Sequence, residues 1–590
     1  MTRIIGIDLG TTGCALASVE GEEETWSTPE TFEIAQLVKP ADVKPRKGLP
    51  SFLYLAGEGE LPDGALDLPW SSGRDFMVGE AARERGAEVP ARLVSSSKSW
   101  LSHMAADREG PILPAGAPPE VPQISPVEAA QRYIEHLRDA WNAEHSDAPL
   151  EEQDIYLTVP ASFDAAAREL TVKAAEGAGL SKVVLLEEPQ AAFYAWLAQA
   201  GETWREQLSP GDRVLVCDVG GGTSDFSLIE VTDDGSGALG LERVAVGEHL
   251  LLGGDNMDLA LAHVLSQSLA AAGKKLDAGQ RRALVLAARR AKEALLSDDT
   301  LKSQKVTVLG RGSRLFGNQI KTELTRDVLQ QVLLEGFFPM CGKEELPQEA
   351  LQTGFMEIGL PYVSDAAITR HLAQFLSRHA KDRLPSHVLF NGGVFNAEML
   401  RTRLLETLGT WGAPPIPLEG GDNDLAVARG AAWYGAVRSG GGLRIRGGVA
   451  RSYWIGMEVP MPAVPGMQPP MRALCVVPFG MEEGSEAKVP GPTLGMVVGR
   501  PAAFRFLSSS TRKDDAVGTV LDEYTWPEHL EETSPIKATM EAEDIDAGTR
   551  LPVQLEAKLT EVGTLELWCV TTDEKHRFRL EIDVREPSAG

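Results

Sequence analysis

The stretch that most constrains the fold of this chain is a glycine-rich turn between two apolar runs, within residues 213–231. The runs are largely β-branched, which is typical of two buried strands joined by a tight hairpin. The turn contains Gly220, Gly221 and Gly222, followed by Thr223. Because glycine has no Cβ, a large anion can approach the backbone N–H groups, as it does in phosphate-binding loops. An ordinary hairpin in a sheet is the alternative interpretation.

An acidic residue stands at the end of the first run. Asp218 is placed where its carboxylate can face an anion held by the turn. A carboxylate beside a polyphosphate requires a cation between the two, and Mg²⁺ is the usual one. The stretch therefore predicts a polyphosphate on the turn and a magnesium ion next to Asp218.

The first residues of the chain repeat this pattern. Asp8 ends an apolar run and is followed by a turn of small residues, Gly10, Thr11, Thr12 and Gly13, and by a second apolar run. An internal repeat of this kind predicts two similar lobes. Two such turns, one in each lobe, predict a cleft that binds one polyphosphate from both sides, and this makes the ordinary-hairpin alternative much weaker.

Length and composition limit the class of protein. A chain of 590 residues is too long for one hydrophobic core, so several subdomains are expected. The formal net charge of −28 argues against nucleic acid or an anionic membrane as a partner. No apolar run approaches the ~20 residues of a membrane span and no signal peptide is evident, so we expect a cytoplasmic protein. The five cysteines and ten histidines have no metal-binding spacing, which predicts reduced, buried cysteines and no zinc site.

Several other residues are candidates for the same site, but each also has an ordinary structural explanation. Lys98 on its own is typical of a solvated surface group. Glu188 follows a strand and opens a helix, where open α/β sheets place their sites, although an acid there also pairs with the helix dipole. Lys292 fits a solvated basic helix face. Gly392 and Gly393 lie between a strand and a helix, a junction that any αβ unit can use.

The character of the sequence changes near residue 440. Before it, strands alternate with helices, which predicts an α/β fold. Residues 441–448 contain two groups of glycines and are predicted to form a linker. Short alternating segments in residues 449–590 predict an antiparallel β-sandwich. The small residues within 419–438 predict a helix that packs closely on another and suits a hinge between lobes, whereas residues 335–363 give no assignment.

Together these features resemble the DnaK-type seventy-kilodalton heat-shock chaperones, the Hsp70 family, within the actin, sugar kinase and heat-shock ATPase group. The similar motifs are residues 5–12 and 218–225 for the phosphates, 159–163 and 186–192 between the lobes, and 391–393, in altered form, for adenosine. The likeness covers residues 1 to about 440 well and the rest loosely.

The resemblance implies a domain organisation. A two-lobed, actin-like (ribonuclease H-like) ATPase domain would occupy residues 1–440, followed by the linker and a substrate-binding-like β-sandwich. Lobe I would comprise about residues 1–210 and 411–440, and lobe II about residues 211–410.

The resemblance also implies the metal and phosphate ligands. Asp8 and Asp218 would hold Mg²⁺, mainly through waters, beside ATP or ADP, with K⁺ as a further candidate ion. The backbones of residues 10–13 and 220–223 would cradle the phosphates.

The remaining site residues receive roles in the same way. Lys98 would polarise the γ-phosphate and the attacking water, and Glu188 would order the water shell of the metal. Thr223 and Asp225 would help to position the water. The adenosine would be flanked by Lys292, Gly392 and Gly393. Such roles agree with phosphoryl transfer, which depends on positioning and charge neutralisation more than on covalent chemistry.

Several positions depart from the pattern of the family. Arg289 stands where the helix beside the adenine usually carries an acid, and Asn396 stands where the adenosine motif usually has arginine. The glycine-rich residues 441–448 replace an acidic and aliphatic linker. No helical lid over a peptide groove and no acidic terminal tetrapeptide are evident, so peptide release should be fast.

Three functions are compatible with this sequence. The first is an ATP-hydrolysing chaperone whose nucleotide state controls the binding of unfolded or extended polypeptide, with co-chaperones or a nucleotide exchange factor as further partners. The second is a nucleotide-gated module that binds one dedicated protein partner and uses slow ATP hydrolysis as a timer. The third is a small-molecule kinase, against which stand the β-domain and the lack of a candidate base for a substrate hydroxyl.

Overall fold

The computed structural model describes most of the chain, which forms two compact units. Unit 1 comprises Met1–Leu241 and Ala245–Arg444, unit 2 comprises Glu242–Val244 and Ile445–Gly590, and each is described by itself. The residues described are 2–22, 25–103, 106–161, 163, 165–233, 239–247, 250–309, 319–348, 360, 363–380, 383–419, 421–439, 445–446, 449, 451–459, 469–481, 485–509, 512, 514–522, 524–532, 536–539, 545–546, 548–559 and 564–583.

The first sheet of unit 1 is built on the N-terminal hairpin. Its strand order is β12-β11-β1-β2-β3, and β4 and β7 also pair with β2. The strands are β1 Thr2–Leu9, β2 Gly13–Glu22, β3 Thr25–Trp26, β4 Glu30–Thr31, β7 Leu49–Pro50, β11 Asp154–Val159 and β12 Val183–Glu187. The main helices of this lobe are α3 Pro126–Glu144, α4 Ala165–Gly177, α5 Glu188–Ala200 and α12 Ala426–Arg438, with α6 Trp204–Gln207 and the short helices η2 Leu150–Glu152 and η3 Gly201–Thr203.

Smaller elements between β2 and α3 extend lobe I. They are the pair β5 Ile34–Lys39 and β6 Asp42–Arg46, the sheet of β8 Leu53–Leu55, β9 Phe76–Val78 and β10 Leu93–Val94, and the helices α1 Glu80–Glu88, η1 Pro90–Arg92 and α2 Ser97–Leu101. Helix α3 begins with a cap typical of helix N-termini: the Ser125 side chain accepts a hydrogen bond from the Glu128 amide at 2.9 Å, and Pro126 is the first helical residue.

The second sheet of unit 1 is built on the central hairpin, with neighbouring strands in the order β19-β18-β13-β14-β15. These strands are β13 Arg213–Val219, β14 Ser224–Asp233, β15 Leu239–Val246, β18 His387–Asn391 and β19 Ile416–Leu418. The other elements of lobe II are α7 Gly254–Ala271, α8 Ala278–Ser297, the hairpin β16 Ser303–Leu309 and β17 Gln319–Thr325, α9 Arg326–Gln330, the π-helix η4 Gln331–Phe337, α10 Ile368–His379, η5 Gly393–Asn396 and α11 Glu398–Trp411.

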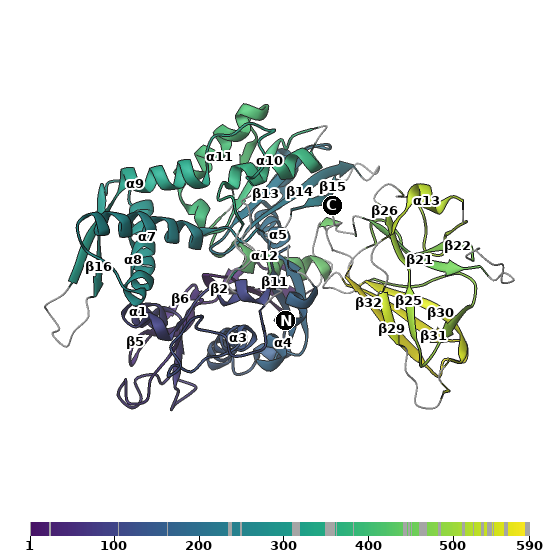
Figure 1. Ribbon diagram of the computed structural model, residues 1–590, viewed down its shortest axis with the longest axis horizontal. Helices are drawn as coiled ribbons and strands as arrows, with labels where there is room; N and C mark the ends of the chain where they lie inside the picture. Colours follow the sequence, from purple (N-terminus) through teal and green to yellow (C-terminus); the bar gives the residue numbers. More distant parts are fainter. Residues whose placement is uncertain are drawn as a thin grey trace. The chain divides into compact units, whose positions relative to one another are not determined.

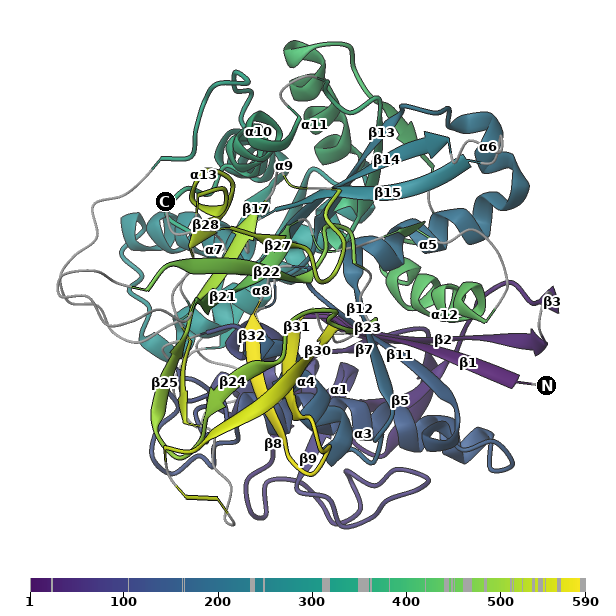
Figure 2. The same ribbon diagram turned by 90° about the vertical axis from the view of Figure 1, so that its right-hand side faces the viewer.

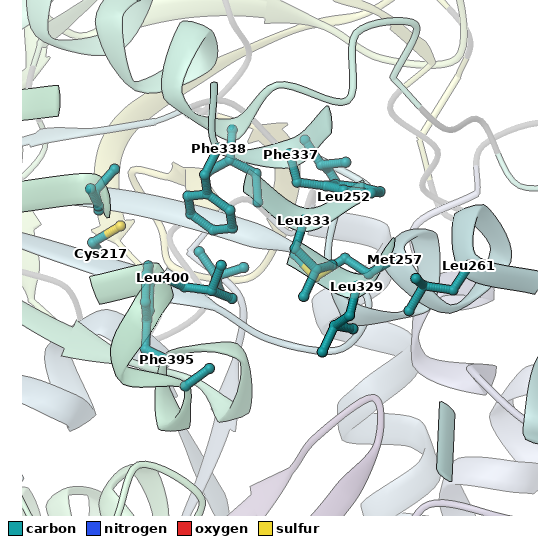
Figure 3. Packing of buried hydrophobic residues seen from close by; sticks show 14 of the residues in the cluster. Cys217, Leu252, Met257, Leu261, Leu329, Leu333, Phe337, Phe338, Phe395 and Leu400 are labelled. Atoms are coloured by element: carbon teal, nitrogen blue, oxygen red, sulfur yellow. The ribbon is translucent and has the colours of Figure 1, made fainter. Parts of the chain in front are cut away.

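The core of lobe II joins the helices to this sheet. Figure 3 shows Met257 and Leu261 of α7 together with Leu333 of η4, and the aromatic rings of Phe338 and Phe395 lie in the same cluster. Residues 335–337, which the sequence left unassigned, therefore end a helix whose apolar side is buried. Residues 349–359, 361 and 362 of the unassigned stretch lie outside the described residues.

The predicted internal repeat is confirmed by the strand pairing. In each lobe an antiparallel hairpin, β1–β2 or β13–β14, has a parallel neighbour, β11 or β18. The register places Asp8 opposite Thr158 and Asp218 opposite Asn391. Both acids therefore stand at equivalent positions of their sheets, near the carboxyl ends of the first hairpin strands.

Helix α12 packs against α5 and the first sheet, as Figures 1 and 2 show. The predicted close approach of small residues is confirmed: a Cβ on Gly430 would lie 1.7 Å from the carbonyl oxygen of Ala191, and a Cβ on Gly6 would lie 2.1 Å from that of Ala428.

One predicted boundary is wrong. Residues 411–440 were assigned to lobe I, but Ile416–Leu418 pairs with β18 of the second sheet, because a parallel edge position is available there.

Unit 2 is a β-sandwich, as predicted. One sheet has the order β27-β22-β21-β26-β28, and the other has β23-β30-β31-β32 with β24 also on β30. The elements are β21 Ser452–Glu458, β22 Met471–Val477, β23 Glu486–Lys488, β24 Leu494–Val497, β26 Phe506–Ser509, β27 Val520–Leu521, β28 Glu531–Glu532, β30 Arg550–Leu559, β31 Thr564–Thr571 and β32 Arg577–Asp583, with the pair β25 Pro501–Phe504 and β29 Ile536–Thr539 and the helix α13 Trp526–His529. Residues of both sheets form one core, among them Ile455, Leu474, Leu555 and Leu567.

All five cysteines are free and buried, as expected. Among the described residues, no helix is long and apolar enough to cross a membrane. Of the predicted linker, residues 441–448, only Ile445–Arg446, the strand β20, is described, and the rest lies outside the described residues.

The contact between α12 and α5 generates a test of the scaffold. Gly430→Ala should lower the free energy of unfolding of unit 1 by about 2 kcal/mol, because the new methyl group overlaps a backbone oxygen that must move. Gly336→Ala is the matched control, since a Cβ there meets nothing within 4 Å. Differential scanning calorimetry should show a lower unfolding temperature for Gly430→Ala only, and equal temperatures for the two variants would contradict the close packing.

Candidate functional site

The two glycine-containing turns of unit 1 lie against each other. A Cβ on Gly221 would lie 2.0 Å from the Thr12 side chain, and a Cβ on Gly222 would lie 2.7 Å from the side chains of Thr11 and Ser99. Any residue larger than glycine at 221 or 222 would therefore collide with the opposite lobe. The predicted convergence of the residue 10–13 and 220–223 turns is confirmed.

Buried charged side chains surround the meeting point of the turns. Lys98 of α2 is 7% exposed and forms an ion pair with Glu188, the first residue of α5. Asp218 is buried at the end of β13, and Asp225 is buried opposite it on β14. Asp8, at the equivalent position of β1, interacts electrostatically with both Glu188 and Lys98. The residues predicted from distant parts of the sequence thus lie in one site.

Burial and mutual repulsion make these carboxylates difficult to ionise. Burial, and then the charge of Glu188, raises the pKa of Asp8 to about 7. Burial raises the pKa of Asp218 well above its usual range, and Glu188 and Asp225 add to the effect. Burial would lower the pKa of Lys98, but the neighbouring Glu188 and Asp8 raise it, so the ammonium stays charged. The site therefore carries more potential negative charge than its lysine neutralises.

This donor set fits a hydrated divalent cation. The fit is not that of a fully protein-bound metal, because no group of three or more His, Cys, Asp or Glu side chains in the described part of the chain is arranged to hold one. Mg²⁺ is usually bound through one or two carboxylates and keeps several of its waters. Asp8 and Asp218, with Glu188 and Asp225 nearby, could hold such an ion through its waters, and the ion would supply the missing positive charge.

The second turn is supported from behind by the start of α7. The amides of Gly254 and Asp255 donate to the carbonyl oxygens of Gly220 and Gly221 at 3.0 and 2.7 Å. Within the turn, the Gly220 amide donates to the carbonyl oxygen of Thr223 at 2.9 Å. Thr223 is 8% exposed, so its predicted place beside the phosphates is sheltered from bulk water.

The glycines of the predicted adenosine motif lie directly beside Asp218. Gly392 has a φ of +84°, which favours glycine, and a Cβ there would lie 2.3 Å from the Val219 carbonyl oxygen and 2.7 Å from Asp218 Oδ1. A Cβ on Gly393 would lie 2.9 Å from Asp424 Oδ1. The motif is therefore constrained by the acid site and by the segment before α12.

Lys292 also lies near this motif, but its ammonium group is already engaged. Its Nζ is 2.8 Å from Asp258 Oδ1 and donates to the Gly254 carbonyl oxygen at 3.2 Å. Arg289 forms ion pairs with Asp258, at 2.5 Å, and with Asp255. The arginine that stands at an unusual position for the family is thus bound within lobe II by acids of α7.

Helix α8 also contacts lobe I. Arg289 lies 5.6 Å from the centre of the Phe52 ring, Arg290 pairs with Glu84 at 2.8 Å, and Arg282 donates to the Gly116 carbonyl oxygen at 2.9 Å. Helix α8 therefore joins lobe II to lobe I.

The sequence analysis missed several residues that support the site. Thr158 donates to Asp8 at 3.1 Å, and Asn391 donates to Asp218 at 2.8 Å. Asp424 accepts a hydrogen bond from Asn396 at 2.9 Å and interacts electrostatically with Asp8. Their common signal is a polar residue at the end of a strand or just before a helix, which is informative only once the strand order is known.

A buried ion pair fixes the residue before Glu188. Arg168 and Glu187 are almost fully buried, and their charged groups are 3.1 Å apart. Arg168 also donates to the carbonyl oxygens of Phe163 and Ala161 at 3.0 and 3.1 Å. No local pattern in the sequence singles out this pair, although residues 159–163 and 186–192 belong to the recognised inter-lobe motifs.

Comparisons with known proteins agree with this geometry. The sequence model of the family described as "Hsp70 protein" matches residues 90–341. A "Chaperone protein HscA homolog" of Bordetella pertussis is 33% identical over 344 residues, which are 56% of this chain and 46% of the relative. A homolog of the same name from Pseudomonas putida is 32% identical over 306 residues, covering 50% and 42%. The "Chaperone protein HscA" of Salmonella arizonae is 30% identical over 357 residues, covering 59% and 50%.

The chain spans about half the length of the curated relatives it matches. The family match includes Lys98, Glu188 and the central hairpin, which are the residues that the structure brings together. Over residues 90–341 this chain is therefore similar to the Hsp70 family, and the repeated hairpins and the two-lobed α/β unit agree with that similarity.

Proposed function

We propose that this protein is an ATP-dependent chaperone, which binds and hydrolyses ATP in the cleft of unit 1 and uses the nucleotide state to control polypeptide binding by unit 2. The observation that carries the proposal is the convergence of two glycine turns on a buried cluster of carboxylates and one lysine. The curated relatives are named as chaperones, which supports the same assignment.

The phosphates would lie between the two turns. The backbone amides of residues 10–13 and 221–223 would bind the phosphate oxygens, since the turns consist of glycines and threonines only. Magnesium, held through waters by Asp8 and Asp218, would supply the positive charge that a polyphosphate needs beside these acids.

The remaining charged residues would prepare the reaction. Lys98 would stabilise charge on the terminal phosphate, because its pKa stays high in a buried position. Glu188 would hold Lys98 in place and orient water, and Thr223 and Asp225 would position the attacking water from the facing hairpin. Hydrolysis to ADP and phosphate by this route depends on positioning and charge neutralisation.

The adenosine would lie beyond Gly392 and Gly393. A cavity of about 530 Å³ adjoins this region and is lined by Leu296, Asn396, Met399 and Arg403, among others. Leu296 is one helical turn beyond Lys292, so the cavity lies next to the predicted adenosine residues. Since the Lys292 ammonium is engaged by Asp258, we expect it to act through its aliphatic stem or after exchange of that ion pair.

The β-sandwich of unit 2 would bind extended polypeptide, either unfolded clients or one dedicated partner. Strand edges and apolar pockets of such a domain suit an extended chain. Co-chaperones or an exchange factor would act on the same cycle.

Removal of one acid should separate metal-dependent from metal-independent binding. Asp218→Ala should weaken ATP binding in the presence of Mg²⁺ by at least about 100-fold, the upper end of what loss of a supporting residue costs a metal site. Asp327→Ala, which removes an exposed acid of lobe II, should leave the affinity unchanged. Isothermal titration calorimetry with and without Mg²⁺ measures the effect, and wild-type affinity in Asp218→Ala would contradict the assignment.

Coupling to polypeptide tests the chaperone function itself. An unfolded peptide should increase the rate of phosphate release by the wild-type protein, and ATP should increase the rate at which a fluorescent unfolded peptide dissociates. Asp218→Ala should show neither effect. If neither effect occurs in the wild type, general chaperoning is wrong, and co-purification of one stoichiometric protein would then favour a dedicated partner.

A further inference from the structure

The two acids of the site are each held by a side chain from the neighbouring parallel strand. In lobe I, Thr158 Oγ1 of β11 donates to Asp8 Oδ1 at 3.1 Å. In lobe II, Asn391 Nδ2 of β18 donates to Asp218 Oδ2 at 2.8 Å. The register makes Thr158 and Asn391 equivalent positions of the internal repeat. Different residue types therefore perform the same hydrogen bonding in the two lobes.

Asn391 differs from Thr158 in having a second polar atom. The side chain is 2% exposed, and its Oδ1 has no hydrogen-bond partner among the described residues. When Asp218 is ionised, as it would be beside a cation, the amide cannot be reversed without loss of the bond to Asp218, because only its nitrogen can donate to a carboxylate. A buried acceptor left unpaired is costly, so its presence beside the acid site points to a group that binds there.

Gly392, the residue after Asn391, lies close to the other oxygen of the Asp218 carboxylate. A Cβ on Gly392 would lie 2.7 Å from Asp218 Oδ1. Thus the Asn391 amide holds one oxygen of Asp218, and only glycine fits at residue 392 beside the other oxygen. The Asp218 carboxylate is therefore oriented by the end of β18 and the residue that follows it.

We propose that Asn391 is a positioning residue of the magnesium and nucleotide site: its Nδ2 orients Asp218, and its Oδ1 accepts a hydrogen bond from a water that enters with the hydrated cation. This inference rests on the proposed function. Supporting residues of this kind commonly set the affinity of a metal site without touching the metal.

The test compares binding of ADP with Mg²⁺ and of ADP in EDTA by isothermal titration calorimetry, using the full chain. Asn391→Leu keeps the size of the side chain but removes both polar atoms. It should weaken binding of ADP with Mg²⁺ by about 10- to 100-fold and change binding of ADP in EDTA by less than about twofold. Ser227→Ala is the matched control, because Ser227 Oγ is also buried and has no hydrogen-bond partner among the described residues, but it lies on β14 opposite Val216, two positions from the pair of Asp218 and Asp225.

The outcomes separate this inference from the proposed function. If the wild type does not bind ADP with Mg²⁺, the proposed function is wrong. If the wild type binds and Asn391→Leu loses no more affinity than Ser227→Ala, or loses it equally with and without Mg²⁺, Asn391 has only a structural role. Thermal unfolding without ligand checks the fold, and Asn391→Val, whose side chain suits a strand, should give the same result. Failure of both variants to fold would show that Asn391 serves the fold and would overturn the positioning role.

Discussion

Unneutralised carboxylates at the ends of two equivalent strands are the constraint on which the site depends. Asp8 and Asp218 are brought together by the internal repeat, and burial makes both hard to ionise. The ammonium group of Lys98, which forms an ion pair with Glu188, offsets part of the negative charge of the site. A bound cation would offset the rest. The glycine turns meet beside these acids, where their backbone amides would bind an anion that brings such a cation with it.

The scaffold around the acids is rigid for identifiable reasons. Backbone contact at Gly6 and Gly430 leaves no space between α12, β1 and α5, so the strand that carries Asp8 and the helix that begins at Glu188 are fixed to each other. The buried pair of Arg168 and Glu187 fixes the residue before Glu188, and removing one partner of such a pair would leave an uncompensated charge. The positions of Asp8 and Glu188 are thus fixed by packing of neighbouring residues that do not themselves belong to the site.

The sequence predicted those parts of the site that are local in the chain. Asp218 and Gly221 stand in one short motif, so the strand, acid and turn could be recognised without any tertiary information. Thr158 and Asn391 could not be selected, because each becomes relevant only through the parallel pairing of strands that are far apart in the sequence. The predicted start of the returning lobe I segment was wrong because Ile416–Leu418 pairs with β18, and a three-residue strand carries little sequence signal.

The most direct measurement of the central claim is a crystal structure of the full chain with ADP and Mn²⁺ in place of Mg²⁺, with anomalous diffraction used to locate the metal. The account predicts one manganese peak between the two hairpins, with its bound waters hydrogen-bonded to both Asp8 and Asp218. A peak that contacts one hairpin alone, or a nucleotide bound away from the two turns, would contradict it.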